Sequence, residues 1–379
     1  MQLNNFCELI VDCEHKTAPL AETGFPSIRT PNIGRGRLIL DQVNRVSEKT
    51  YNQWTKRAVP IVDDLILARE APAGNVAIIK DPEIRVCLGQ RTVLIRPNKE
   101  KIDPNYLVYL LLNDEMQHKL LSCSAGATVP HVNMADIRKL DLPILPDLFV
   151  QKVLGDCLSQ YDDLIENYSR RIEILELTIE AIYKEWFVDF RFPNYMSTRL
   201  IDSVIGKVPE GWSVESLKDY VEFVRGVEPG SANYRNESGS NMVSFLRVGD
   251  MGSRKSNIFV SFDLAKGKIL YPNDIAISLD GTVGLVKRGL SGAYSTGIRK
   301  ISIKKDLSES FVYALMKSEL IQNTIRAHAS GATILHAGSS VKHMVFVKPN
   351  KSVLQTFNEI VNPMLDLILV LESKNCLLM

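Results

Sequence analysis

The stretch VQKVLGDCLSQYDDLIENYSRRIEILELTIEAIYKEWF, residues 150–187, sets the organisation of this 379-residue chain. Its apolar side chains recur at steps of four and three residues. They are Val150, Leu154, Cys157, Tyr161, Leu164 and Tyr168 and, after one extra step of four, Ile172, Leu175, Ile179, Ile182 and Trp186. This spacing is typical of a coiled-coil helix with one stutter. Because no proline lies between Pro146 and Pro193, we predict one helix of roughly 40 residues.

The same pattern returns near the C-terminus, 353 − 150 = 203 residues later. Its positions are Val353, Phe357, Ile360, Met364, Leu367 and Leu371. A long amphipathic helix needs a partner for its apolar face, because packing supplies most of its stability in water. We therefore predict that the two helices pack on each other in an antiparallel coiled coil, with a kink at Pro363 in the second helix.

Short segments outside the helices are also repeated, in the same order. DDLILAREAPAG (63–74) returns as NDIAISLDGTVG (273–284), LVYLLL (107–112) as FVYALM (311–316), and SAGATVPH (124–131) as ASGATILH (329–336). Ordered matches of this kind indicate a tandem duplication. The segments are short and apolar with turn residues around them, as strands or short helices near loops are. We predict an α+β fold with two similar mixed α/β domains, each followed by a long helix.

Breaks in the pattern suggest the domain boundaries. We expect a first domain at 1–146, its helix at 147–192, a linker at 193–210 with Pro193 and Pro209, a second domain at 211–349 and a final helix at 350–379.

Composition points to an ordinary globular protein, with 45% hydrophobic and 23% charged residues. The net charge of +1 gives no global attraction to nucleic acid or to an anionic membrane, so any phosphate binding must come from local patches. The six cysteines never form a CxxC pair, which predicts reduced thiols and no metal site. There is no run of eighteen apolar residues and no signal-peptide pattern, so we expect a cytoplasmic protein without a membrane partner.

Common catalytic motifs are missing from both copies. There is no GxxxxGK[ST] loop, no GxGxxG after a strand, no HExxH, no GxSxG and no [DN]PP[YF] tetrapeptide of the amino-methyltransferase type. We therefore predict a binder without catalytic residues or cofactor. This disfavours a self-sufficient methyltransferase or nuclease.

His131 and His336 occupy matching positions in the repeat, three residues after Thr128 and Thr333 of the two GAT triplets. An imidazole there can donate to a phosphate or a base edge. The alternative is a loop histidine satisfied by backbone.

Basic and polar residues near turns are candidates for holding a DNA duplex, with solvated loops as the alternative. The phosphate candidates are Lys16, Thr17, Arg29, Arg35 and Arg37 in the first copy and Arg247, Arg254 and Lys255 in the second. The candidates for reading bases are Arg69, Glu70, Asn75 and Arg91, and in the second copy Asp280, Thr282 and Arg299. These side-chain types make the usual contacts to phosphates and to major-groove base edges.

EWFVDFRFPN (185–194) followed by IGKVPEGW (205–212) closely resembles the central region of specificity subunits of type I restriction-modification systems. REAPAGNVAI (69–78) and CLGQRTVLIRP (87–97) resemble the body of their target recognition domains. The resemblance implies two target recognition domains separated by two long conserved helices. Each domain would read one half of an asymmetric bipartite target in double-stranded DNA.

The same resemblance implies partners: adenine methyltransferase (modification) subunits and restriction/translocase subunits. Trp186, Phe187 and Phe190 would then either anchor a modification subunit or pack on the second domain. The competing hypothesis is a non-catalytic scaffold, whose tandem modules bind protein ligands and are held by a coiled coil.

Overall fold

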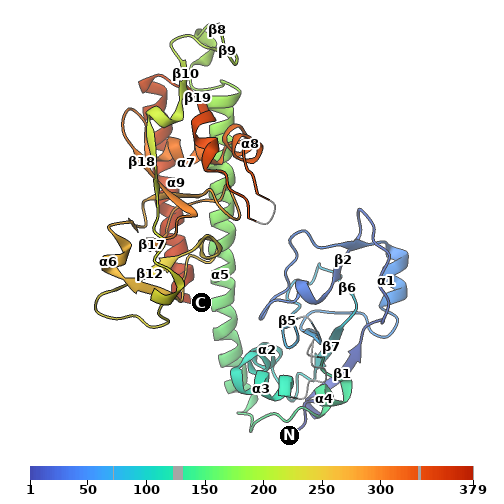
Figure 1. Cartoon of the computed structure of the whole chain (residues 1–379). Helices are drawn as coiled ribbons and strands as arrows, with labels where there is room; N and C mark the ends of the chain where they lie inside the picture. Colours follow the sequence, from blue (N-terminus) through green and yellow to red (C-terminus); the bar gives the residue numbers. More distant parts are fainter. Residues whose placement is uncertain (71, 123–130, 332–333, 379) are drawn as a thin grey trace. The chain divides into compact units, whose positions relative to one another are not determined.

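The computed structural model describes residues 1–70, 72–122, 131–331 and 334–378 (Figure 1). The chain divides into two compact units, Met1–Leu164 and Ile165–Met379. Each unit is built around a four-stranded antiparallel sheet, and each is described below by itself.

The main sheet of the first unit is buried on both faces. Its strand order is β1 (Cys7–Asp12), β7 (Thr92–Pro97), β4 (Leu65–Ala68) and β5 (Val76–Ile78). Successive side chains of a strand point to opposite faces. In β4, Leu65 and Leu67 accordingly enter the core under the helices, whereas Ile66 and Ala68 enter a second core. Double-sided burial explains why LILA reads as a continuous apolar run rather than an alternating one.

Shorter elements surround that sheet. A small sheet has the order β3 (Arg45–Val46), β2 (Phe25–Ile28) and β6 (Cys87–Leu88). The helices are α1 (Glu48–Trp54), α2 (Pro104–Leu112), α3 (Asp114–Ser122) and α4 (Met134–Lys139), and 3-10 turns span Leu3–Phe6 (η1) and Thr30–Asn32 (η2). The α2 helix begins at Pro104 because the Asp103 side chain accepts from the Tyr106 N–H at 2.8 Å and Pro104 fits the first helical position.

The second unit repeats this topology. Its main sheet has the order β11 (Val221–Arg225), β18 (Ile298–Ile303), β15 (Ile275–Ser278) and β16 (Val286–Lys287), and its small sheet β13 (Phe259–Ser261), β12 (Met242–Leu246), β17 (Gly292–Tyr294) and β14 (Ile269–Leu270). In both small sheets one strand pairs antiparallel on one side and parallel on the other. The remaining elements are α6 (Phe262–Ala265), α7 (Glu309–Lys317), α8 (Glu319–Ala327), β10 (Ser213–Ser216), β19 (Val345–Lys348) and the 3-10 turns η5 (Leu217–Asp219), η6 (Ser231–Asn233), η7 (Val248–Met251) and η8 (Gly338–His343). The shared strand order confirms the predicted pair of similar domains.

A pair of glutamines shows how closely the two units correspond. Nε2 of Gln117 donates to the carbonyls of Gly74 and Leu111, and Nε2 of Gln322 donates to those of Gly284 and Met316. Gln117 lies on α3 and Gln322 on α8, at a separation of 322 − 117 = 205 residues. Because the two glutamines bond the ends of α2 and α7 in the same way, α2 of the first unit corresponds to α7 of the second. The proposed match of LVYLLL with FVYALM was one residue out of register, because it aligned Tyr109 with Tyr313 instead of aligning the helix ends.

In each unit the chain enters and leaves at the same edge. Gln2 forms a β-bridge with Asp141, and the Leu3 N–H donates to the Leu140 carbonyl at 2.9 Å. In the second unit β10 pairs antiparallel with β19 over four residue pairs. The segments on either side of each domain are therefore held side by side by backbone hydrogen bonds.

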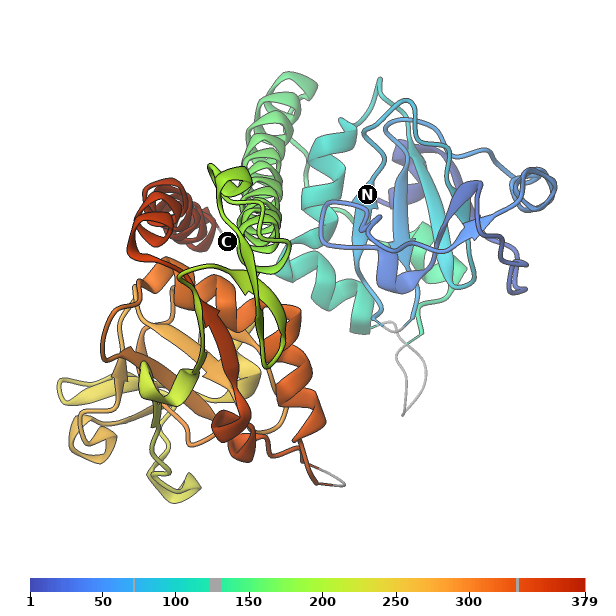
Figure 2. The ribbon, with the colours of Figure 1, turned by 90° about the horizontal axis from the view of Figure 1, so that it is seen from above.

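The long helices are α5 (Leu148–Tyr183), which continues as a π-helical turn over Lys184–Val188, and α9 (Lys351–Leu378). Inside the second unit they run antiparallel, as predicted: Tyr183 packs against Phe357 at one end, and Nδ2 of Asn375 donates to Oγ of Ser169 at 3.0 Å at the other. Figure 2 shows both helices nearly end-on, beside each other.

The predicted stripe on α9 was displaced by one residue in its middle. The side chains buried there are Val361, Leu365 and Ile368, whereas Ile360 is 37% exposed. The heptad pattern failed because α9 contacts both α5 and the body of the second unit, so its apolar surface is wider than one seam. The helix also passes through Pro363 without interruption.

The first half of the α5 stripe is exposed rather than packed. Val150, Leu154, Tyr161 and Leu164 are 38%, 44%, 51% and 38% exposed. This part of α5 instead contacts its own unit through a face of small and polar residues, Gln151, Gly155, Ser159 and Asp162. Backbone at Tyr106 lies so close to Gly155 that a Cβ there would be 2.6 Å from the Tyr106 nitrogen.

By length and composition alone, α9 is apolar enough to cross a membrane, a test that core helices of globular domains also pass. Its residues Val353, Phe357, Val361, Leu365 and Ile368 belong to the core of the second unit. This burial is typical of a core helix.

Between the helix end and the second domain lies a 3-10 turn, η4 (Tyr195–Ser197), and a hairpin of β8 (Leu200–Ser203) and β9 (Gly206–Pro209). The hairpin occupies most of the segment expected to be a linker.

Candidate nucleic-acid interface

A carboxylate and a histidine meet at the end of β4 in the first unit. Nδ1 of His131 lies 2.5 Å from Oε1 of Glu70, and Nε2 of His131 lies 2.8 Å from Nη2 of Arg69. A guanidinium only donates hydrogen bonds, so Nε2 accepts and we assign the proton to Nδ1, which donates to Glu70. Arg69 is buried and also donates through Nε to the Val132 carbonyl at 2.8 Å, so it holds the histidine rather than facing solvent.

The same carboxylate carries an arginine on its other oxygen. Nε of Arg91 lies 2.9 Å from Oε2 of Glu70, and the Arg91 side chain is 57% exposed. The Arg69 N–H donates to the Arg91 carbonyl at 2.9 Å, which places Arg91 beside the strand end. Glu70 thus orients one exposed guanidinium and one imidazole.

The second unit contains a related arrangement, in which the carboxylate and the histidine occupy matching positions but the arginine does not, because Arg299 lies within β18 whereas Arg91 precedes β7. Nδ1 of His336 lies 2.8 Å from Oδ1 of Asp280, and Nη2 of Arg299 lies 3.6 Å from Oδ2 of Asp280. Arg299 also donates to the Thr296 carbonyl. Burial lowers the pKa of the Arg299 guanidinium, and the attraction of Asp280 partly offsets this. We call Glu70, His131 and Arg91, and likewise Asp280, His336 and Arg299, the two acid–histidine–arginine triads.

The two triads present different groups to solvent. Arg91 is 57% exposed whereas Arg299 is 11% exposed, and His131 is 33% exposed whereas His336 is 62% exposed. In addition, the residue before the carboxylate is Arg69 in one unit and an apolar leucine in the other. The first unit therefore presents mainly an arginine and the second mainly a histidine.

A capped turn follows the β2 and β12 strands beside each triad. Arg29 and Arg247 are exposed, and the backbone N–H of each is capped, by Oδ1 of Asn32 at 3.1 Å and by Oδ2 of Asp250 at 2.9 Å. These caps explain why the two dissimilar sequences PSIRTPN and FLRVGDM form the same 3-10 turn.

Close backbone approaches join each turn to its triad. A Cβ on Gly89, two residues before Arg91, would lie 2.9 Å from Cγ of Arg29. A Cβ on Gly297 would lie 2.7 Å from Cγ2 of Val248 and 3.6 Å from Cβ of Asp280. Turn and triad are therefore adjacent in both units.

Lys16 and Thr17 extend the surface in the first unit. Both are exposed, and Oγ1 of Thr17 donates to Oε1 of Gln90 at 3.4 Å. The Lys16 carbonyl accepts from Nε1 of Trp54 at 3.4 Å. Sequence reasoning missed Gln90, although its position directly before Arg91 was a usable signal.

Other predicted residues lie elsewhere or bind their own chain. Nδ2 of Asn75 donates to the Ile33 carbonyl at 2.9 Å, and Nη2 of Arg35 donates to the Leu112 carbonyl at 2.7 Å. Arg37 pairs with Asp163 and Arg254 with Glu372.

Four predicted residues remain. Thr282 is exposed in the turn after β15, where its carbonyl accepts from Oγ of Ser278 at 2.5 Å, and Lys255 is exposed after η7. Thr128 and Thr333 lie outside the described residues.

The aromatic end of α5 is part of the second unit's core. Phe187 is 4% exposed, and its ring centroid lies 4.9 Å from that of Phe311 and 5.0 Å from that of Phe357. Trp186 contacts Phe357, and Phe190 contacts Trp212 edge-on. In the described residues, the contacts of these rings agree with the second of the two predicted roles, packing on the second domain.

Comparisons with known proteins give the fold and the interface a context. Residues 1–177 match the family model described as "Type I restriction modification DNA specificity domain". Across 336 residues the chain is 24% identical to the Type I restriction enzyme MjaIX specificity subunit of Methanocaldococcus jannaschii, covering 86% of this chain and 76% of that protein. It is 22% identical to the Type I restriction enzyme HindI specificity subunit of Haemophilus influenzae, covering 78% and 79%.

A solved structure shows the same fold over the full length. The type I restriction-modification system S subunit from M. genitalium superposes with a TM-score of 0.63 at 13% identity, covering 100% of this chain and 92% of that one. Residues 1–177 therefore match a type I restriction modification DNA specificity domain, and across most of its length the chain is similar in sequence to type I restriction enzyme specificity subunits, with the fold of one such subunit.

Proposed function

We propose that this chain is the non-catalytic, sequence-reading subunit of a cytoplasmic type I restriction-modification complex. It recognises an asymmetric bipartite target in double-stranded DNA and directs adenine methylation and restriction by its partner subunits. We take residues 1–146 and 211–349 as the two target recognition domains, each reading one half-site.

The observation that carries this proposal is the acid–histidine–arginine triad, repeated beside a capped arginine turn. Carboxylates accept from the exocyclic amino groups of cytosine and adenine, and arginine donates to guanine. In the first unit the Glu70 carboxylate holds His131 at 2.5 Å and Arg91 at 2.9 Å. Hydrogen-bonding groups fixed relative to one another in this way are suited to reading a base edge. Because the two triads expose different groups, we expect the two half-sites to differ.

Local charge supplies the affinity. The net charge is only +1, so attraction to DNA phosphates must come from exposed Lys16, Arg29, Arg247 and Lys255. Arg35, Arg37 and Arg254 are left out of this surface because each binds a distant part of its own chain, whereas Arg247 pairs with Asp250 three residues away and its side chain stays 53% exposed. Binding that depends on such phosphate contacts weakens steeply as salt rises, whereas an apolar protein interface would respond little.

The long helices support a spacing role. One helical turn is about 5.4 Å and one base-pair step about 3.4 Å, so adding one turn shifts a domain by between one and two base pairs. The adenine methyltransferase subunits and the restriction/translocase subunits would assemble on the helices and domains. The exposed residues Val150, Leu154, Tyr161 and Leu164 on α5 offer an apolar surface for such assembly.

The decisive experiment is a genome-wide adenine-methylation map of cells that carry the modification subunit, with and without this chain. We expect a split, asymmetric motif that is methylated only when the chain is present. Identical maps, with a folded chain shown to bind the modification subunit, would instead support the protein-binding scaffold.

A further inference from the structure

We infer that Arg37 and Arg254 are positioning residues that tie the reading surface of each recognition domain to the long helix that follows it. This rests on the proposed function. In each unit an arginine shortly after the capped turn pairs with a carboxylate on the long helix: Arg37 with Asp163 of α5, and Arg254 with Glu372 of α9. We call these two ion pairs the helix ties.

The arginines of the helix ties occupy similar places in the repeat, whereas their carboxylates do not, because the 203-residue offset between the long helices matches Asp163 with Asp366 rather than with Glu372. Arg29 and Arg37 are separated by 37 − 29 = 8 residues, and Arg247 and Arg254 by 254 − 247 = 7 residues. Each tie therefore leads directly from the turn beside the triad to the helix. Sequence reasoning grouped all these arginines as phosphate contacts, whereas the geometry divides them into exposed Arg29 and Arg247 and helix-bound Arg37 and Arg254.

Neighbouring contacts hold the first tie in place. The segment before Arg37 is anchored on the main sheet, because the Gly36 N–H donates to the Val76 carbonyl at 2.8 Å. The residue before Asp163 is held as well, since the Tyr109 hydroxyl donates to Oδ2 of Asp162 at 2.7 Å. The segment that carries Arg37 and the helix that carries Asp163 are therefore each held in place by a hydrogen bond of the neighbouring residue.

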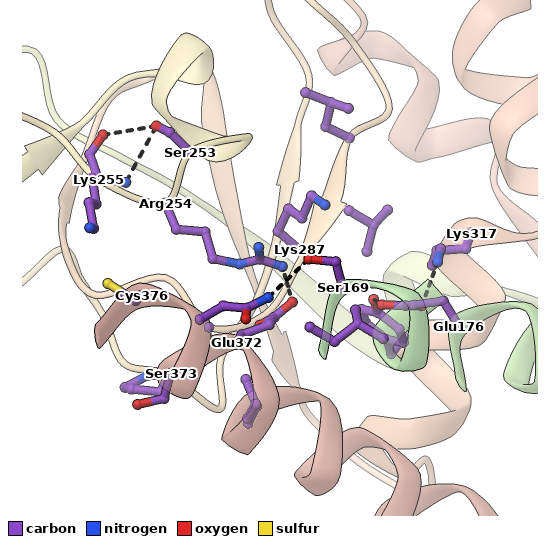
Figure 3. Close-up of a pocket in the computed structure, with 18 of the residues that line it drawn as sticks. Ser169, Glu176, Ser253, Arg254, Lys255, Lys287, Lys317, Glu372, Ser373 and Cys376 are labelled. Carbon is purple, nitrogen blue, oxygen red and sulfur yellow. Dashed lines mark hydrogen bonds and ion pairs between the residues drawn. The ribbon is translucent and has the colours of Figure 1, made fainter. Parts of the chain in front are cut away.

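The second tie is more deeply buried than the first, whose Asp163 side chain is 59% exposed. Figure 3 shows the Arg254 guanidinium beside the Glu372 carboxylate. The Glu372 side chain is only 9% exposed, and a Cβ on Gly289 would lie 2.8 Å from its Oε2, so the carboxylate rests against bare backbone. Arg254 adopts a φ of +56°, a conformation that costs a non-glycine residue free energy and persists only where surrounding contacts determine it. Nε of Arg254 also donates to the Arg288 carbonyl at 3.4 Å.

The second tie also lines a cavity of about 840 Å³ between α5, α9 and the body of the second unit. In the same cavity wall Asn375 bonds Ser169, and Lys317 pairs with Glu176 of α5 at 2.6 Å. At this end of the helices, polar contacts therefore supplement the apolar core that joins them to the reading domain. Loss of the tie should let the domain shift on the helices without disturbing the triad.

The test separates spacing from base reading. The full chain with its modification subunits is titrated against duplexes that carry both half-sites from the methylation map, with the natural spacer or one base pair more or less. In Arg254→Met/Glu372→Leu, which removes both charges and fills their volume, we expect the preference for the natural spacer to fall roughly tenfold, with unchanged preference at each base.

Two further variants complete the design. Arg254→Glu/Glu372→Arg reverses the pair and should restore spacer preference, which distinguishes a tie from simple loss of folding. Lys99→Met removes an exposed pair with Asp63 and should leave spacer preference unchanged.

The contrary results are equally definite. A folded double variant that keeps full spacer preference, or loses base preference to the same degree, overturns the inference. A wild-type complex that ignores spacer length on every duplex overturns the proposed function itself, and this inference with it.

Discussion

Nδ1 of His131 lies 2.5 Å from Oε1 of Glu70, and the same relation recurs between His336 and Asp280 at 2.8 Å. The pairs join segments that are 61 and 56 residues apart in sequence. Each therefore holds the end of a central strand against the segment that leads into the next helix or turn. A hydrogen-bonded pair of this kind fixes the direction in which the remaining ring nitrogen and the paired arginine point.

We expect His131→Ala to weaken recognition of one half-site and His336→Ala that of the other, each by about 1–3 kcal/mol. The measurement is binding of the complex to duplexes altered in one half-site at a time. His118→Ala on α3, outside both triads, is the control. Equal losses at both halves from a single variant would contradict separate reading by the two domains.

Gly74→Ala and Gly284→Ala should each destabilise the chain by about 1–3 kcal/mol. Both glycines have positive φ, +94° and +88°, and a Cβ would lie 2.6 and 2.5 Å from the amide oxygen of the neighbouring glutamine. Urea unfolding checks the loss. Gly252→Ala, where φ is −70° and no atom lies within 4 Å of a Cβ, should change stability little, and a similar loss there would refute the conformational explanation.

Phe187→Ala should destabilise the second unit by about 3–5 kcal/mol, because it leaves a cavity among Tyr183, Phe311 and Phe357. Thermal unfolding of the isolated full chain is the measurement. Phe149→Ala removes a ring that is 77% exposed and should shift stability by no more than about 0.5 kcal/mol. If Phe187→Ala kept full stability but lost binding to the modification subunit, the ring would be an interface anchor instead.

Lys287→Met should raise the melting temperature by about 2 °C at pH 7. Burial lowers the pKa of the Lys287 ammonium, and nearby Arg254 and Lys317 lower it further, against the attraction of Glu372 and Glu176. The unfolded chain thus binds this proton more tightly, so the wild type gains stability as pH rises from the lowered value towards 10.5. The difference between variant and wild type should therefore shrink at pH 10. A constant difference would show that packing rather than charge is responsible.

The fold was largely predictable because it rests on periodicity and repetition. The spacing of apolar residues from Val150 to Trp186 predicts the long helix, and the repeated segments predict the duplicated strands and helices. Which face of each helix is covered was not predictable. The first half of α5 contacts its domain through Gly155 and Asp162, a face with no apolar pattern to reveal it.

The site was predictable residue by residue but not as pairs. Glu70, Arg91 and His131 were each candidates, yet nothing in their spacing shows that one carboxylate holds the other two side chains. Arg37 and Arg254 were predicted as phosphate contacts, and their ion-pair partners could not be foreseen because they lie 126 and 118 residues away. Long-range ion pairs leave no periodic trace in a sequence.

The pairing of each domain's entry and exit segments has a consequence for the gene. Gln2 bridges Asp141, and β10 pairs with β19, so the two ends of each domain lie next to each other. A unit whose ends meet can be exchanged for a related one without moving the chain around it. Under the proposed function, two crossovers in the DNA that encodes these paired segments would give a protein with a new half-site, and a different specificity would then arise by recombination alone.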